Sequence, residues 1–121
     1  MKTVLVIDDD QQFRTAIYEL LQDHGYSVLE AENGSQGWNT YRTETTDIIL
    51  TGLIMPHTDS IHMIRQIRAV DRKIPIIAIS EHSIGSAPNY LNILKLLGAS
   101  STLKKPFTDS ELLLALQDVN G

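Results

Sequence analysis

Short runs of apolar residues alternate along the chain with segments in which apolar residues recur every three or four positions. The run from Val4 to Ile7 is continuous, as in a strand of a parallel sheet buried on both faces. After it, Phe13, Ile17, Leu20 and Leu21 have the spacing of one helix face. Similar apolar runs predict further strands at 26–31, 47–51, 76–80 and around 102–103. Five strands alternating with five helices predict an α/β fold, with a parallel sheet and helices on both faces.

Polar residues mark the ends of several predicted helices. Asp9 or Asp10 can cap the first helix. Pro88 suits the first turn of a fourth helix that runs to about residue 97, and Gly98 suits its end. Residues 108–111 match the T-x-x-E capping box, which predicts the start of the last helix. Each cap falls between an apolar run and a helical repeat, so the two patterns support each other.

Charged or hydroxyl-bearing residues stand at or after the ends of three predicted strands, and a glycine follows a fourth. These residues are Asp8 and Asp9, then Gly52, Ser80 and Lys105. In open parallel sheets, ligands bind outside the carboxyl ends of the strands. Two neighbouring carboxylates ~4 Å apart repel each other by about 4 kcal/mol at an effective dielectric constant near 20. We expect either a divalent cation such as Mg²⁺ or the Lys105 ammonium to offset that repulsion.

Composition limits the classes of function. The chain has 121 residues, which is the size of one domain, and we expect residues 1–121 to form it. Its formal net charge is -5 and its basic residues are scattered, which argues against direct nucleic-acid binding. No segment approaches the ~20 apolar residues that a membrane helix needs. Cysteine is absent, so disulfides are excluded, and we expect a cytoplasmic protein without a membrane span.

Five motifs occur in a fixed order: V-L-V-I-D-D-D, D-I-I-L-T-G-L-I-M-P, I-P-I-I-A-I-S, L-G-A-S and K-K-P-F. In this order and spacing the chain resembles the response-regulator receiver domains of two-component signalling, from about residue 2 to residue 119. The resemblance implies a flavodoxin-like (βα)5 fold, doubly wound, with strand order 2-1-3-4-5. It also implies a phosphorelay module that is not an enzyme.

The resemblance implies a role for each motif residue. Asp8 and Asp9 match the acidic pair that holds Mg²⁺, and Ile54 matches the residue whose backbone carbonyl completes the metal site. Ser80 matches the hydroxyl residue that contacts the phosphoryl group and switches rotamer. Lys105 matches the lysine that forms a salt bridge with the phosphoryl group.

The chain departs from the family pattern at several positions. Gly52 stands where the family has its phosphate-accepting aspartate, and Thr102 stands at the aromatic switch position. Glu81 replaces the usual small residue after the switch hydroxyl, the loop that it begins is longer than usual, and Ser60 stands where the family often has glycine. Glycine has no nucleophile, so we expect no aspartyl phosphorylation. We also expect Mg²⁺ affinity to be weakened and Lys105 to turn toward Asp8 or Asp9.

The leading hypothesis is a degenerate receiver that acts by protein–protein contact. Its partner would be a histidine kinase, an effector domain or another receiver, and a homodimer is left open. A second hypothesis is an ordinary phosphoaccepting receiver that carries an Asp-to-Gly change at position 52. A third, of another class, is a flavodoxin-like module that binds a small ligand at the same sheet edge. The acidic residues after the first strand would repel an anionic cofactor, which argues against the third hypothesis.

Overall fold

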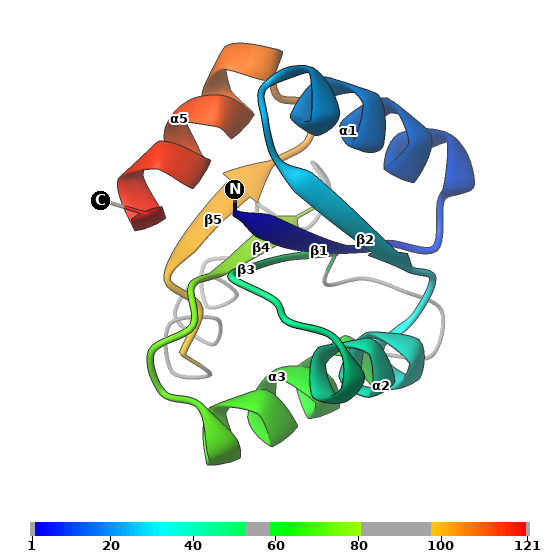
Figure 1. Cartoon of the computed structure of the whole chain (residues 1–121), viewed down its shortest axis with the longest axis vertical. Helices are drawn as coiled ribbons and strands as arrows, with labels where there is room; N and C mark the ends of the chain where they lie inside the picture. The colour runs from blue at the N-terminus through cyan, green and yellow to red at the C-terminus, as the bar shows by residue number, and fades with distance from the viewer. Residues whose placement is uncertain (1, 53–58, 81–97, 121) are drawn as a thin grey trace.

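Five parallel strands form one sheet in the computed structural model, which describes residues 2–52, 59–80 and 98–120 (Figure 1). The strand order is β2-β1-β3-β4-β5, with every neighbouring pair parallel. This confirms the predicted fold class and strand order. The strands are β1 (Thr3–Ile7), β2 (Ser27–Ala31), β3 (Ile48–Gly52), β4 (Ile76–Ser80) and β5 (Ser101–Lys104).

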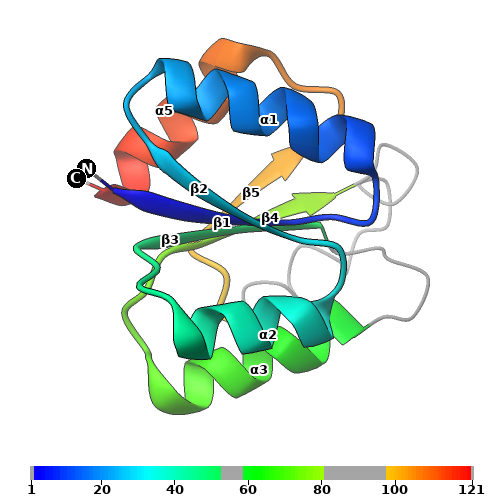
Figure 2. The same ribbon diagram turned by 45° about the vertical axis from the view of Figure 1, so that its right-hand side comes forward.

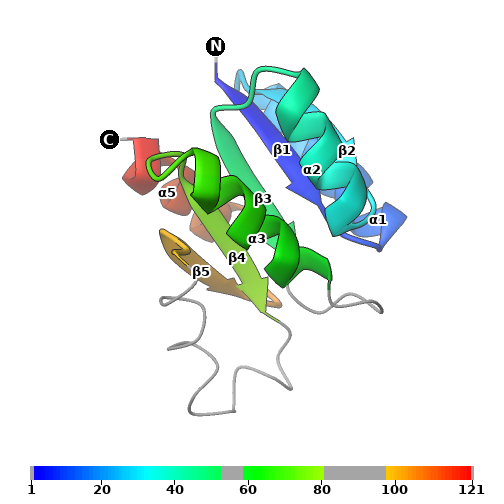
Figure 3. The same ribbon diagram turned by 90° about the horizontal axis from the view of Figure 1, so that it is seen from below.

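Helices cover both faces of the sheet. They are α1 (Gln11–Asp23), α2 (Gly34–Thr43), α3 (Asp59–Val70) and α5 (Asp109–Asn120). Figure 2 shows α1 and α5 above the sheet and α2 and α3 below it, and Figure 3 shows α2 and α3 from their own side. The helix predicted to begin near Pro88 lies outside the described residues.

The strand β1 contributes to two hydrophobic cores. Its residues Val4 and Val6 pack in the core under α1 and α5, together with Ile17 and Leu116. Its residues Leu5 and Ile7 pack in the core on the α2 and α3 side. All four strand residues have no exposed surface. The continuous apolar run is therefore explained, because successive side chains point to opposite faces and both faces are covered.

The predicted helix caps are present at α1 and α5. Asp10 caps α1, and its Oδ1 accepts hydrogen bonds from the amides of Gln12 at 3.0 Å and Phe13 at 3.3 Å. At α5, the Glu111 amide donates to Thr108 Oγ1 at 3.1 Å, and the Thr108 amide donates to Glu111 Oε1 at 3.0 Å. These reciprocal bonds satisfy amides that have no partner within the helix.

Two predicted strand boundaries are wrong by one residue, and hydrogen bonds explain both. Tyr26 was expected in the second strand, but its amide donates to Leu21 O at 3.0 Å and closes the end of α1 instead. Asp47 was expected in the third strand, but its Oδ2 accepts from the Thr3 amide at 2.8 Å, and β3 begins at Ile48. None of the helices in the described part of the chain is long and apolar enough to span a bilayer.

Candidate functional site

Four of the predicted site residues lie at the carboxyl edge of the sheet. Asp8 follows β1, Gly52 and Ser80 are the last residues of β3 and β4, and Lys105 follows β5. These strands are neighbours in the order β1-β3-β4-β5. Gly52 pairs with Ile79. The parallel register therefore brings an acid, a glycine, a hydroxyl and an amine to one edge.

Asp8 and Lys105 form an ion pair across this edge. The Lys105 Nζ lies 3.3 Å from Asp8 Oδ2, and the two side chains are 19% and 6% exposed, respectively. The residues are 97 positions apart in sequence. We expected Lys105 to contact Asp8 or Asp9, and the structure shows the contact with Asp8.

The environment of Asp8 shifts its acidity. Burial raises the pKa of Asp8 above its ordinary value, and the neighbouring charge of Asp9 acts in the same direction. The Asp10 amide, which donates to Asp8 Oδ1 at 3.0 Å, and the Lys105 ammonium lower the pKa but do not cancel the effect of burial. The carboxylate is thus poorly solvated and depends on Lys105 for charge compensation.

Gly52 faces the same carboxylate. A Cβ atom added to Gly52 would lie 2.9 Å from Asp8 Oδ2 and 3.7 Å from the Ile7 carbonyl oxygen. A side chain at residue 52 would therefore require the Asp8 carboxylate, the far end of a flexible side chain, to shift. The neighbouring Thr51 is fully buried, and its hydroxyl donates to the Gly52 carbonyl at 2.9 Å.

Ser80 and Thr102 lie on the outer strands of the site. Ser80 is 2% exposed, and its hydroxyl donates to the Leu103 carbonyl at 3.4 Å. Thr102 is half-buried and pairs with Ala78 in the ladder between β4 and β5, two positions before the end of β5. The predicted contributions of Ile54 and Glu81 fall outside the described residues.

The donor set at this edge fits Mg²⁺ poorly. The described residues contain no group of three or more His, Cys, Asp or Glu side chains that could hold a metal ion. Asp8 already accepts from Lys105, and Asp9 is exposed. Hard cations of this kind prefer several oxygen ligands, and Gly52 supplies no side-chain oxygen.

Two residues that sequence reasoning missed support the site from α1. Arg14 donates through Nη1 to the Asp8 carbonyl at 2.5 Å, and its Nε lies 3.3 Å from Glu30 Oε1. The Phe13 ring centroid lies 3.9 Å from Lys105 Nζ. A positive charge in the first turn of a helix interacts unfavourably with the helix dipole, so Arg14 needs a nearby partner. This unfavourable position was the signal in the sequence that could have identified Arg14.

Comparisons with known proteins give the same family. A family model described as "Response regulator receiver domain" matches residues 4–117. GtcR of Aneurinibacillus migulanus is 30% identical over 117 residues, which cover 96% of this chain and 46% of the relative. The chemotaxis protein CheY of Bacillus subtilis is 29% identical over 114 residues, covering 93% of this chain and 92% of CheY.

A solved structure also matches over nearly the whole chain. The chemotaxis response regulator CheY4 of Vibrio cholerae superposes with a TM-score of 0.88 and 28% identity, covering 98% of each chain. The chain spans about half the length of several curated relatives that it matches. The family match, the strand order and the carboxyl-edge residues agree, and the chain belongs to the response regulator receiver domains.

Proposed function

We propose that this chain, as a single receiver domain over residues 1–121, has lost aspartyl phosphorylation and acts through contact with another protein. Gly52 stands at the phosphoacceptor position in this proposal. The observation that carries it is the packing of Asp8 against Gly52, where an added Cβ would lie 2.9 Å from Asp8 Oδ2. Gly52 therefore offers no attacking carboxylate at the point where Asp8 and Lys105 converge.

The neighbouring side chains do not replace the missing nucleophile. Attack on phosphorus by an aspartate needs a carboxylate oxygen with a free line of approach. The two oxygens of Asp8 are engaged by the Asp10 amide and the Lys105 ammonium. The Thr51 hydroxyl is buried and bonded to the Gly52 carbonyl. In this proposal these described neighbours of Gly52 accept no phosphoryl group, and the domain is not an enzyme.

Ser80, Thr102 and Lys105 are the remnant of a phosphoryl pocket in this proposal. Lys105 has turned to Asp8, and the Ser80 hydroxyl is bonded within the sheet. Asp8, Asp9 and the Ile54 carbonyl would be the ligands for Mg²⁺. An acceptor aspartate would supply a further carboxylate ligand, which Gly52 does not, and Lys105 competes for Asp8. The site therefore binds Mg²⁺ only weakly.

The partner is a protein in this proposal, because a signalling domain that accepts no phosphoryl group can still act by binding another protein. A histidine kinase, an effector domain or another receiver fits the family, since receivers work with such partners. The surface is acidic overall, with a formal net charge of -5, which favours a partner with a basic contact face.

The proposal is tested by incubating the chain with acetyl phosphate and Mg²⁺ and measuring its intact mass. We expect no phosphoryl adduct. A receiver domain that carries an acceptor aspartate serves as the positive control. An adduct that maps to any aspartate of this chain would overturn the proposal.

The second candidate is an ordinary receiver changed only at residue 52. The presence of Asp8, Ser80 and Lys105 at one edge of the sheet favours it, because the other residues of the expected pocket are in place. The variant Gly52→Asp separates the two candidates, with Gly52→Asn as a control of equal size and no charge. Rapid phosphorylation of Gly52→Asp would show that the remaining residues are intact, while a silent variant would show that other changes have also removed the activity.

A further inference from the structure

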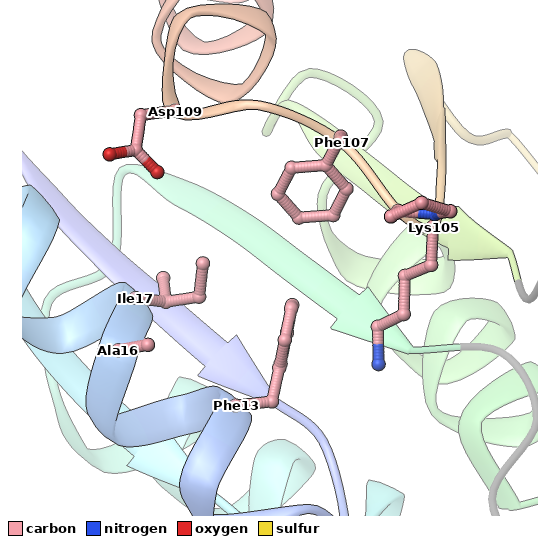
Figure 4. Close-up of a pocket in the computed structure, with 7 residues that line it drawn as sticks. Phe13, Ala16, Ile17, Lys105, Phe107 and Asp109 are labelled. Carbon is pink, nitrogen blue, oxygen red and sulfur yellow. The ribbon is translucent and has the colours of Figure 1, made fainter.

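A cleft lies between α1 and the turn that joins β5 to α5 (Figure 4). Its volume of about 490 Å³ is within the range of ~300–1,000 Å³ that small-molecule sites occupy. Aromatic and aliphatic side chains make up most of its lining, and the charged residues stand at its ends. Six residues that line it are Phe13, Ala16, Ile17, Lys105, Phe107 and Asp109.

Two aromatic rings form the apolar wall of the cleft. Phe13 and Phe107 meet edge to face, with ring centroids 6.0 Å apart and planes at 87°. Both side chains are half-buried and pack against the core under α1 and α5. Because these rings are already ordered, a ligand that packs against them pays little entropy for fixing them. The negative faces of aromatic rings also attract cations and repel anions.

The positive charge of Lys105 is already compensated. Its side chain lines the cleft, but its Nζ lies 3.3 Å from Asp8 Oδ2 and over the Phe13 ring, 3.9 Å from the ring centroid. Asp9 and Asp10 follow Asp8 directly, and both are exposed. The acids therefore outnumber the cation at this edge, and the local field favours a positively charged ligand over an anion.

Asp109 adds a negative charge to the wall of the cleft itself. It is the first residue of α5, and Figure 4 shows its carboxylate directed toward Ile17 of α1, at the end of the cleft opposite Lys105. Within the described part of the chain, the Asp109 carboxylate forms no ion pair or hydrogen bond with another residue. This carboxylate is therefore open to the cationic group of a ligand whose apolar part lies beside it.

We propose that this cleft binds a small amphiphilic ammonium ion, with its cationic group at Asp109 and its apolar body against Ile17 and the rings of Phe13 and Phe107. Apolar walls with a single well-placed polar group are the usual composition of a small-molecule site. The inference goes beyond the proposed function, because it concerns a ligand site beside the carboxyl edge and does not depend on the residue at position 52.

The test uses 2-phenylethylammonium, the neutral 2-phenylethanol and the anionic phenylacetate, which are similar in size and carry the same ring. The backbone amide signals of Phe13, Ile17 and Phe107 are followed by NMR at constant ionic strength. We expect saturable shifts with the ammonium ion and about threefold weaker binding of the alcohol, a ratio that an exposed ion pair supports. Phenylacetate should bind more weakly than the alcohol. Salt at about 1 M should narrow these differences, because it screens exposed charges.

Four variants make the test specific. Ala16→Phe places a ring in the cleft and should abolish saturable binding, while Leu114→Phe adds the same ring at an exposed position of α5 and should not. Asp109→Asn should bind the ammonium ion and the alcohol equally, whereas Asp118→Asn, at an exposed acid of the same helix, should keep the threefold preference. Equal binding of the two compounds to the unaltered chain, a preference that survives Asp109→Asn, or binding that survives Ala16→Phe would overturn the inference.

Failure of the inference and failure of the proposed function give different results. A phosphoryl adduct after treatment with acetyl phosphate removes the proposed function and leaves the cleft as it is. Absence of saturable shifts with 2-phenylethylammonium, or tighter binding of phenylacetate than of the alcohol, removes the inference alone. Both measurements use the same purified chain.

Discussion

Asp8 is a nearly buried carboxylate whose compensating charge comes from the protein itself. It contacts Lys105 at 3.3 Å and lies against Gly52, and burial raises its pKa. A buried ion pair is stabilising only when its hydrogen bonds are well satisfied, and here the Asp10 amide supplies one of them. The pair therefore joins β1 to the residues after β5.

The variant Gly52→Asp should make stability dependent on Mg²⁺. A second carboxylate beside Asp8 adds repulsion and a steric conflict, and we expect a loss of about 1–3 kcal/mol in the free energy of unfolding in the presence of EDTA. Added Mg²⁺ should restore much of that loss, as measured by urea denaturation. Gly52→Asn, which lacks the charge, should show no such response to Mg²⁺. An equal response of the two variants would contradict the electrostatic explanation.

The convergence of Asp8, Gly52, Ser80 and Lys105 could be predicted from sequence, because the carboxyl ends of parallel strands share one edge. The helix side chains that reach this edge could not. Phe13 has the spacing of a core residue, and only the fold shows that its ring also contacts Lys105. The functional roles of these residues stay predictions until the phosphorylation and metal-binding experiments are done.

At the scale of elements, α2 approaches the sheet closely at Gly37. A Cβ atom at this residue would lie 2.6 Å from Ile7 Cδ1 and 2.7 Å from Met63 Sδ. These atoms belong to β1 and α3, so one glycine sets the distance of α2 from both. Glycine in a helix interior costs about 1 kcal/mol relative to alanine, and the close packing offsets that cost.

The variant Gly37→Ala should destabilise the chain despite the better helix propensity of alanine. Overpacking of a well-filled core costs about 1–3 kcal/mol, and after the gain of about 1 kcal/mol in helix propensity we expect a net loss of up to about 2 kcal/mol. Thermal and urea denaturation measure it, with Thr40→Ala on the same helix as the matched control. A Gly37→Ala variant that is more stable than the unaltered chain would show that α2 can shift outward freely.

The capping box of α5 gives a second prediction at this scale. Thr108→Ala removes the hydroxyl that accepts from the Glu111 amide at 3.1 Å. We expect the free energy of unfolding to fall by about 1 kcal/mol, the usual effect of losing an N-cap side chain. Ser110→Ala, an exposed neighbour in the first turn, should change it little. Equal losses in the two variants would argue against a specific cap.

Helix starts were easier to predict than strand ends. Asp10 and Thr108 act through neighbours two or three residues away, so their effect can be recognised in a short sequence window. The first residues of β2 and β3 depend on bonds from Tyr26 to α1 and from Asp47 to Thr3. The Asp47 bond spans 44 positions, and such long-range hydrogen bonds leave no local pattern.

At the scale of the whole molecule, a polar network joins α2, α3 and the approach to β5. The Tyr41 hydroxyl lies 3.3 Å from Asp71 Oδ2, and Arg68 donates to the Asp71 and Gly98 carbonyls. The Asp71 Oδ1 accepts from the amides of Lys73 and Ile74. These bonds hold the pKa of Asp71 below its ordinary value of 3.8, and the hydrogen bond from the Lys73 amide has the largest effect.

This network predicts part of the acid sensitivity. Because the folded-state pKa of Asp71 is lowered, its stabilising effect is full above the ordinary value of 3.8 and is lost as pH falls through the lowered value. Between about pH 5 and about pH 3 the unaltered chain should therefore lose more stability than Asp71→Asn. Urea denaturation across this range measures the difference, with the exposed Asp118→Asn as the charge control. Parallel pH profiles for the unaltered chain and Asp71→Asn would contradict it.

The architecture as a whole could be predicted because the central strands β1, β3 and β4 are covered on both faces. Alternate residues of β1 belong to different cores. A continuous apolar run such as residues 4–7 is typical of a central strand in a parallel sheet, so this strand could be predicted from the sequence. The segment from residue 81 to residue 97, where a further helix is predicted, lies outside the described residues.

The contact between Asp8 and Gly52 has an evolutionary consequence. With no side chain at residue 52, the carboxylate of Asp8 has settled into the adjoining space and joined Lys105. An aspartate at residue 52 would require that carboxylate, the far end of a flexible side chain, to shift. Under the proposed function, regaining an acid at residue 52 therefore takes one base change and also a rearrangement of the Asp8–Lys105 pair.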